Sequence, residues 1–201
     1  MSDSQTNHKL TNGRHWKHIY VRNRRRALGI NSKQMAWSQV ISLLGSVVAG
    51  VLLETNKETL ALLVGAFVVL PGVFDLDGSI GAALSAKINH KLEKDGESSM
   101  SVLIKSTLSA MMIAALAGLI VAGVGAAIAV WLFGANFGQV FWLAENAILL
   151  SALIGFPLIG TLAVIFRHFK VNPDDVVGPI ESSVFDILTI ITMVLVIGWL
   201  T

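Results

Sequence analysis

Long apolar stretches, separated by short polar connectors, make up most of this 201-residue chain. A helix needs about 20 consecutive apolar residues to cross the roughly 30 Å hydrocarbon core of a bilayer. The stretches approach or exceed that length, so they predict an all-α integral membrane protein. We expect five transmembrane helices, at about 37–53, 60–88, 106–133, 137–166 and 176–200.

The second stretch contains residues that often interrupt a helix. Pro71 and Gly72 lie near its middle, and Gly78 and Gly81 follow soon after. Proline removes a backbone donor and frees a carbonyl to line a cavity, and glycine lets an ion or a neighbouring helix approach the backbone closely. We therefore predict a break in this helix, at a point where it lines a path through the protein.

Composition supports the membrane assignment, because 54% of the residues are hydrophobic and only 14% are charged. A soluble domain of this size needs more charge to cover its surface. The chain has no cysteine, which excludes disulfides, thiolate zinc sites and thiol catalysis. The connectors leave no room for a second soluble domain, so we expect two parts, a tail at 1–36 and a transmembrane domain at 37–201.

The tail at 1–36 is polar and basic rather than apolar, so we expect no signal peptide and a segment that stays in the mature protein. Its basic cluster at 22–26 is typical of an orientation signal at anionic headgroups, and we expect no nucleic-acid partner. With the tail inside, Lys57 is the only Lys or Arg expected outside. The positive-inside rule thus predicts a multi-pass cell-membrane protein with its N-terminus in the cytoplasm and its C-terminus outside.

Acidic residues lie within the apolar stretches, namely Asp75, Asp77, Glu145, Glu181 and Asp186. An ionised carboxylate in mid-bilayer costs at least about 2.5 kcal/mol, so such residues usually face the bundle interior or water and mark an ion path. No Lys or Arg lies in the middle of a stretch to pair with them. We therefore expect a cation, protons or both to balance these charges.

Carboxylate and carbonyl oxygens are the ligands of hard divalent cations. Mg²⁺ gives up its water reluctantly and often binds through one or two carboxylates, which fits a path with few acids. The residues therefore predict divalent-cation transport, with Mg²⁺ as the first candidate and Mn²⁺ and Ca²⁺ as alternatives. Na⁺ and H⁺ are candidate coupling ions.

The last stretch carries a polar stripe on an otherwise apolar helix. Ser182 and Asp186 are four residues apart and share one face, with Glu181 and Ser183 beside it and Thr189 three residues beyond. We expect Asp186 to bind metal. Two other acids keep two interpretations each. Glu181 lines the path or lies at the cytoplasmic interface of the membrane. Glu145 lines an outer vestibule or lies near the outer interface of the membrane.

This last stretch and its lead-in resemble a signature of the MgtE magnesium channels and the related solute carrier family 41. The matching residues are Asn172, Pro173, Asp174, Pro179, Ile180, Ser182, Ser183, Asp186 and Thr189. The resemblance implies that Asp186 binds Mg²⁺ in the pore. Pro71 and the segment 77–81 are similar to the Pro and Gly-Gly-Asn-x-Gly break of the family's second helix. Asp75 and Asp77 stand where the bacterial channels have small residues, and Ser79 replaces the amide.

The resemblance implies a two-fold homodimer with the pore at the subunit interface, and two copies would double the acids around one axis. It also implies a single five-helix unit without the family's large cytoplasmic sensing region. The extra acids keep both a channel and a Na⁺- or H⁺-coupled exchanger open. The predicted metal ligands are Asp186, Asp77, Asp75, Glu181 and Ser182; the predicted pore-lining or helix-break residues are Pro71, Gly72, Gly78, Ser79, Gly81, Asn172, Asp174, Pro179, Ser183, Thr189 and Glu145.

Other classes of protein explain the sequence less well, and we do not expect an enzyme. The pair Asp75 and Asp77 faintly resembles the metal site of membrane CDP-alcohol phosphotransferases, which is the main alternative. That family has wider Asp spacing and further acids at fixed positions, whereas Glu93, Asp95 and Glu97 lie in a connector here. An intramembrane aspartyl protease would need a Gly-x-Gly-Asp motif, and a scaffold would leave the unpaired acids unexplained.

Overall fold

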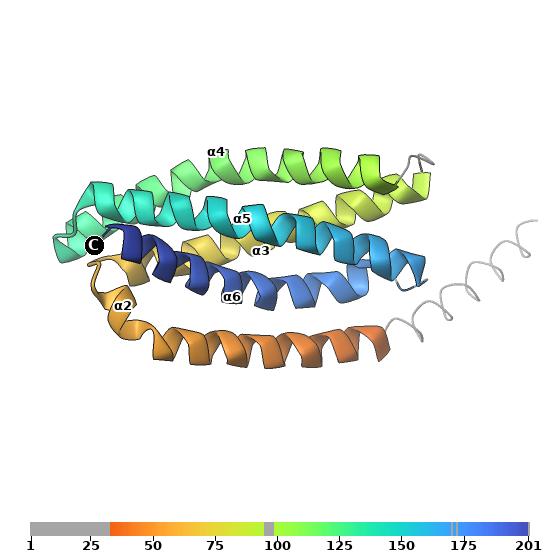
Figure 1. Cartoon of the computed structure of the whole chain (residues 1–201), viewed down its shortest axis with the longest axis horizontal. Coiled ribbons are helices and arrows are strands. Elements are labelled where there is room, and N and C mark those ends of the chain that lie inside the picture. Colours follow the sequence, from red (N-terminus) through yellow and green to blue (C-terminus); the bar gives the residue numbers. More distant parts are fainter. Residues whose placement is uncertain (1–32, 95–98, 170, 172, 201) are drawn as a thin grey trace, which may run out of the picture. The chain divides into compact units, whose positions relative to one another are not determined.

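The computed structural model describes residues 33–94, 99–169, 171 and 173–200, and these residues are helical almost throughout (Figure 1). Within these residues, five helices are long and apolar enough to cross a membrane, which agrees with the number expected from the sequence. The helices are a first span at Lys33–Thr55, then α2 (Lys57–Ala61), α3 (Ala66–Lys94), α4 (Ser99–Phe133), α5 (Phe137–His168) and α6 (Pro173–Leu200).

The chain divides into two compact units, Met1–Trp37 and Ser38–Thr201. Of the first unit the structure describes only residues 33–37, which are helical. The tail expected at 1–36 therefore lies almost entirely outside the described residues and stays an expectation. Everything below concerns the second unit.

Helix α3 corrects the expected break, because it runs without interruption from Ala66 to Lys94. Pro71 is near its N-terminal end, so the one backbone hydrogen bond that it cannot make would go to the first turn. The chain reverses before the helix instead, at residues 62–65. Gly65 adopts φ +98° there, a left-handed conformation that glycine takes without steric cost.

The first span begins at Lys33 rather than 37, and two later helices also begin earlier than expected from the apolar pattern. Helix α4 starts at Ser99 rather than near 106, and α6 starts at Pro173 rather than near 176. The 35 residues of α4 span about 52 Å at 1.5 Å per residue, which exceeds the hydrocarbon core. Hydropathy locates the part of a helix that matches the bilayer core, and polar residues continue the helix beyond it.

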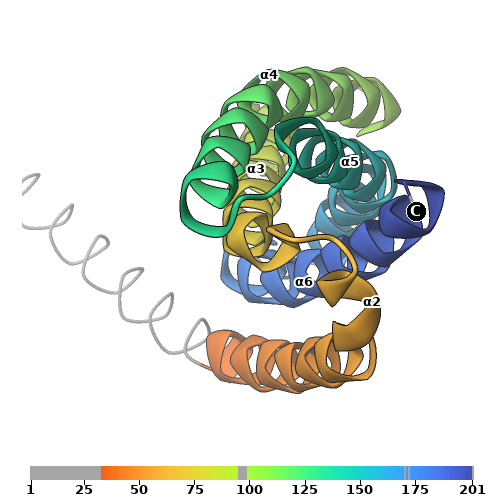
Figure 2. The same ribbon diagram turned by 90° about the vertical axis from the view of Figure 1, so that its left-hand side faces the viewer.

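Helix α3 packs against α4, α5 and α6, and α5 also contacts α4 and α6 (Figure 2). Small residues allow the close approach of α4, whose buried side has Ala or Gly at every fourth position from 110 to 126. At Gly125 a Cβ would lie 2.6 Å from Val69 Cγ1 of α3. The first span reaches α6 through Gly45, where a Cβ would lie 2.6 Å from Ser183 Cβ.

Candidate functional site

Asp77, near the middle of α3, is completely buried where three helices meet. Its Oδ2 accepts hydrogen bonds from Ser151 Oγ of α5 and from Thr189 Oγ1 of α6, the second at 3.2 Å. Its Oδ1 has no hydrogen-bond partner among the residues that the structure describes. One carboxylate oxygen is thus held by two hydroxyls, and the other is buried without a polar contact.

The layers on either side of this carboxylate are apolar. One turn before Asp77 on α3 and Ser151 on α5, and one turn after Thr189 on α6, lie Val73, Ala147 and Met193, all completely buried. One turn in the other direction, Phe185 of α6 fills the space left by Gly81 and Gly155. The Phe185 ring also meets Phe156 edge-on at a centroid distance of 5.4 Å. Asp77 and its two hydroxyls therefore form a polar layer enclosed by apolar ones.

Glu181 is a second buried acid on the same face of α6, with 2% of its surface exposed. A Cβ at Gly81 would lie 3.4 Å from Glu181 Oε1, so this carboxyl packs against the bare backbone of α3. Glu181 Oε2 has no hydrogen-bond partner in the described part of the chain. The structure thus places Glu181 inside the bundle, against α3, rather than on an exposed surface.

Asp75 and Asp186 point away from this interior. Because α3 is continuous, Asp75 lies about 200° around the helix from Asp77 and is exposed. Asp186 follows Phe185 and is turned about 100° out of the packed face, where it is half-buried. Ser182, one turn earlier, is exposed. The acids predicted to act together therefore divide into two pairs. The inner pair, Asp77 and Glu181, is buried inside the bundle, and the outer pair, Asp75 and Asp186, points away from it.

The remaining predicted residues of α3 lie around the helix rather than at a break. Pro71 and Ser79 are exposed, and the Ser79 hydroxyl donates to the Leu76 carbonyl at 3.0 Å. Gly72 is beside Val121 of α4. Gly78 is half-buried and faces open space, so it could accept a neighbouring ligand or chain without strain.

On α6, Pro179 lies within the helix near its start, and the Ser183 hydroxyl donates to the Ile180 carbonyl at 2.9 Å. Ser183 faces the first span at Gly45. Asn172 lies outside the described residues, and Asp174 is described only as part of the helix backbone. Their predicted roles stay predictions.

Glu145 lies apart from both pairs of acids, between α4 and α5. It is 4% exposed, and its Oε2 would be 2.7 Å from a Cβ at Gly118. That oxygen has no hydrogen-bond partner within the described ranges. The glycine lets this side chain pack between the two helices, and its predicted place in an outer vestibule or near the interface stays a prediction.

Sequence reasoning missed three residues that shape the Asp77 site: Ser151, Gly155 and Phe185. The only signal for Ser151 was a hydroxyl in the middle of an apolar span, and such hydroxyls usually bond to their own helix. Ser151 does so as well, because its one hydroxyl hydrogen is shared with the Ile148 carbonyl at 3.0 Å. Its second partner, Asp77, is 74 residues away and could not be inferred from local pattern.

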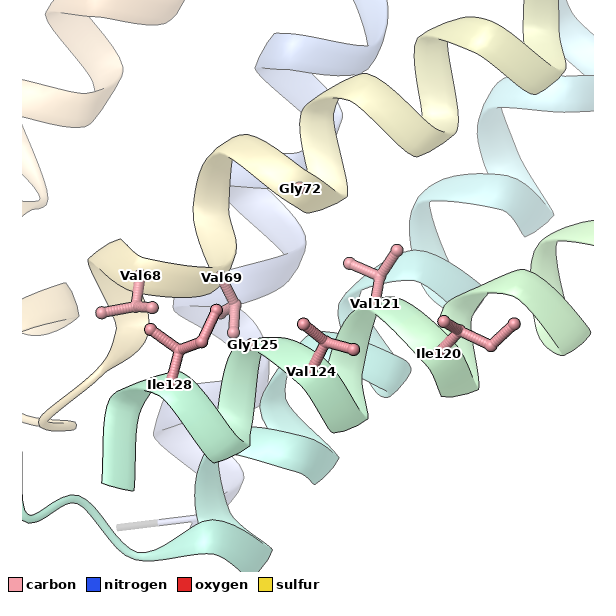
Figure 3. A pocket seen from close by; sticks show the side chains of 8 residues that line it. All are labelled: Val68, Val69, Gly72, Ile120, Val121, Val124, Gly125 and Ile128. Carbon is pink, nitrogen blue, oxygen red and sulfur yellow. The ribbon is translucent and has the colours of Figure 1, made fainter. Parts of the chain in front are cut away.

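A groove of about 350 Å³ lies between α3 and α4, and its lining is apolar (Figure 3). Val68 and Val69 of α3 face Ile120, Val124 and Ile128 of α4 across it. It offers no side-chain oxygen or charge to an ion. The groove is therefore no part of the candidate ion site.

Within the described residues, no three or more His, Asp or Glu side chains converge as a metal site would require. A divalent-cation site built from this chain must therefore use few carboxylates, or carboxylates from more than one copy. The outer pair of acids, Asp75 and Asp186, would therefore need carboxylates of a second copy to form a site with more than two.

Comparison with known families gives one match. Residues 70–196, about two thirds of the chain, match the family described as MgtE, divalent cation transporter. The match includes α3 from Leu70 onward and α6 through Val196, so both motifs that carried the resemblance lie within it. A comparison with curated proteins finds no match. The matched family is one of transporters, which confirms the expectation that the chain is not an enzyme.

Proposed function

Because the chain belongs to the MgtE family of divalent cation transporters, we propose that its cargo is Mg²⁺. We further propose that the ion passes along a path between two copies of the chain, lined by the outer acids of α6 and α3. The observation that carries this proposal is Asp186, a half-buried carboxylate on a membrane-spanning helix. It has no ion-pair partner among the described residues.

Asp186 and Ser182 share one face of α6, beside the packed interior. A carboxylate on this face would meet lipid in a single copy, which costs at least about 2.5 kcal/mol. A second copy related by a two-fold axis covers the face and brings two Asp186 side chains together. Two carboxylates balance the charge of one divalent ion.

Mg²⁺ suits this geometry better than Ca²⁺, because it binds through one or two carboxylates and keeps several waters. Ca²⁺ requires six to eight oxygens. The exposed hydroxyl of Ser182 on α6 and the open side of Gly78 on α3 each leave room beside them for a hydrated ion. Zn²⁺ and Cu²⁺ prefer His or Cys, which this face lacks among its described residues.

Topology completes the proposal. With the N-terminus in the cytoplasm, α3 and α5 run inward and α4 and α6 run outward, so the C-terminus is outside. Glu181 then lies nearer the cytoplasmic end of α6 than Asp77 does of α3. Asp186 lies between these two depths, and Asp75 lies on the outer side of Asp77. This orientation follows from the excess of Lys and Arg on one side.

The test is Mg²⁺ uptake into proteoliposomes with an internal fluorescent indicator, comparing wild type with Asp186→Asn. Glu58→Gln is the matched control, because Glu58 is an exposed acid in the short helix α2, outside the spans. We expect Asp186→Asn to lower the initial rate about tenfold or more, equivalent to at least about 1.4 kcal/mol. Unchanged uptake in Asp186→Asn would exclude this residue from the path, and absent uptake in wild type would contradict Mg²⁺ as cargo.

The same assay, run with and without Na⁺ and pH gradients, separates a channel from an exchanger. Uptake that needs only a Mg²⁺ gradient identifies a channel. Uptake that is driven by an opposing Na⁺ or H⁺ gradient identifies an exchanger. Competition by Mn²⁺ and Ca²⁺ measures selectivity among divalent ions.

A further inference from the structure

A second hollow between α3 and α4, of about 130 Å³, differs from the apolar groove of Figure 3 because one of its ends carries a charge. Lys87 of α3 and Ser106 and Ser109 of α4 line it toward the end where α3 finishes and α4 begins. Ile80 and Ile113 line it about two turns deeper in the same helices. We call this space the inner hollow. A ligand that fills it is polar at one end and apolar at the other.

Lys87 brings a positive charge into a membrane span. It is exposed and lies five residues before the end of the span at Leu92, a depth of about 8 Å at 1.5 Å per residue. Its Nζ donates to Ser109 Oγ at 3.1 Å, and no carboxylate in the described part of the chain forms an ion pair with it. The acidic side chains at 93–97 lie outside the described residues. A cation at this depth is costly unless an anion accompanies it, and an ammonium group has three donors to share between Ser109 and that anion.

Ser106 supplies a second donor at the same end of the inner hollow. It is 1% exposed, and its Oγ has no hydrogen-bond partner among the residues that the structure describes. A buried hydroxyl without a partner costs free energy, which an acceptor in the hollow would remove. Ser106 and Ser109 are three residues apart, so they are neighbours on one face of α4, beside Lys87. An ammonium group with hydroxyl donors suits an anion with several oxygens, such as a phosphate.

Two further lysines make this end of the hollow basic. Lys91 follows Lys87 by one turn on α3, and Lys105 precedes Ser109 by one turn on α4. Because α3 and α4 run in opposite directions, both lysines lie beyond the hollow at the same end (Figure 1). Basic pockets between membrane helices on the cytoplasmic side are typical sites for acidic lipid headgroups. A phospholipid with a net negative charge fits this end better than a zwitterionic one, which would bring its own cation among the lysines.

The apolar part of the inner hollow fits a fatty acyl chain. Small residues, Ala83 and Ala110, leave the space open between the two helices. Ile113 is 53% exposed, and the large apolar side chains of Leu108 and Met112 are exposed on the same helix, as expected for a surface that faces lipid. A free phosphate ion would satisfy the charged end but would leave this apolar part unfilled. A phospholipid occupies both parts.

We propose that the inner hollow binds one anionic phospholipid of the cytoplasmic leaflet. Its phosphate accepts hydrogen bonds from Lys87 and from the hydroxyls of Ser106 and Ser109, and one acyl chain lies between α3 and α4. The site shares none of these residues with the acids that we assign to the Mg²⁺ path, so lipid binding does not rest on the proposed function.

Native mass spectrometry of the purified full-length chain in detergent tests this site, because it counts the lipids bound to each copy. The probes are phosphatidylglycerol and phosphatidylcholine with the same acyl chains. We expect one phosphatidylglycerol per chain at low lipid concentration, with an affinity at least about fivefold higher than that of phosphatidylcholine. Lys87→Gln should lower the phosphatidylglycerol affinity about fivefold. Lys33→Gln is the matched control and should bind as wild type does, because Lys33 is exposed but does not line the inner hollow.

Ala83→Leu tests the apolar part without changing any charge. Ala83 is exposed and lines the inner hollow, so a larger side chain there fills the space meant for the acyl chain. The phosphatidylglycerol affinity should fall severalfold. Ala86→Leu is the matched control, because Ala86 is exposed on the same helix and does not line the hollow. If Lys87→Gln does not fold, Ala83→Leu decides alone.

Three results would contradict the proposal. Equal affinity for the two lipids, or phosphatidylglycerol binding that is unchanged in both Lys87→Gln and Ala83→Leu, would overturn the site. Weaker binding in Ala83→Leu with unchanged binding in Lys87→Gln would overturn the placement of the phosphate at Lys87. Displacement of phosphatidylglycerol by inorganic phosphate at a similar concentration would identify a site for a free anion and overturn the choice of a lipid.

Discussion

Thr189 Oγ1 lies 3.2 Å from Asp77 Oδ2, although 112 residues separate the two along the chain. With the Ser151 hydroxyl on the same oxygen, this contact joins α3, α5 and α6 at mid-span. Polar bonds between membrane helices are individually modest, averaging about 0.6 kcal/mol. Here they hold a buried carboxylate, so losing one has a larger effect than losing an ordinary hydroxyl bond.

Removing the Ser151 hydroxyl should therefore destabilise the fold. We expect Ser151→Ala to lower the free energy of unfolding by about 1–3 kcal/mol, because Asp77 Oδ2 would lose a buried donor. Thr161→Ala on the same helix is the control, since the Thr161 hydroxyl is exposed and donates to the carbonyl of Pro157 in its own helix. Thermal unfolding in detergent measures both; equal midpoints would show that the Ser151 bond contributes nothing.

The fit of Phe185 into Gly155 should be sensitive to a single methyl group. A Cβ at Gly155 would overlap Cε1 of the Phe185 ring, and the opposite edge of the ring packs against Gly81, where a Cβ would lie 2.6 Å from Cε2. We expect Gly155→Ala to destabilise by about 1–3 kcal/mol through overpacking. At Gly123, in α4, an added Cβ meets nothing within 4 Å, so Gly123→Ala should be neutral or slightly stabilising. A midpoint for Gly155→Ala as high as that for Gly123→Ala would contradict this packing.

The proposed dimer can be tested by cysteine cross-linking, because the chain has no native cysteine. Ser182→Cys lies on the face assigned to the two-fold axis, so we expect it to form a disulfide-linked dimer in membranes under mild oxidation. Ile191→Cys is the control on the same helix, exposed but about 180° around it. Non-reducing gel electrophoresis reads the result, and cross-linking at Ile191 but not at Ser182 would place the interface on the opposite face.

Topology can be measured with the same cysteine-free background. A membrane-impermeant maleimide added to intact cells should label Glu58→Cys, which we place outside, and should not label His90→Cys before the membrane is permeabilised. Both positions are exposed in the structure, so accessibility within the protein does not limit either reaction. The reverse pattern would invert the assigned orientation.

Glu145 offers a test of which acids belong to the path. It packs between α4 and α5 against Gly118, apart from the outer acids of α3 and α6. We expect Glu145→Gln to leave Mg²⁺ uptake unchanged, because the amide keeps the shape and removes only a buried charge without a partner. A loss of uptake comparable to that of Asp186→Asn, at equal protein content in the vesicles, would bring Glu145 back into the path as an outer vestibule residue.

The number of spans and the acids within them could be read directly from the chain. Hydropathy over about 20 residues reflects transfer of a local segment into lipid, and this does not depend on the rest of the fold. The family resemblance was also local, since its motifs at 71–81 and 172–189 are short runs of sequence. These features therefore needed no tertiary information.

Which side of each helix faces the interior could not be read in this way. Lipid is as apolar as the packed core, so a membrane helix is apolar all round, and its pattern does not identify the buried face. The expected break at Pro71 failed for a related reason. A proline interrupts a helix only when the surroundings do not compensate, and here the single lost bond lies in the first turn of α3.

Tertiary structure alone decided how the acids divide. Asp75 and Asp77 look equivalent in sequence, but an uninterrupted helix turns one outward and the other inward. Asp77 then finds Ser151 and Thr189, which lie 74 and 112 residues away. Partners at such separations are set by how the helices pack side by side, and in a membrane that packing depends on small residues and shape rather than on hydrophobicity.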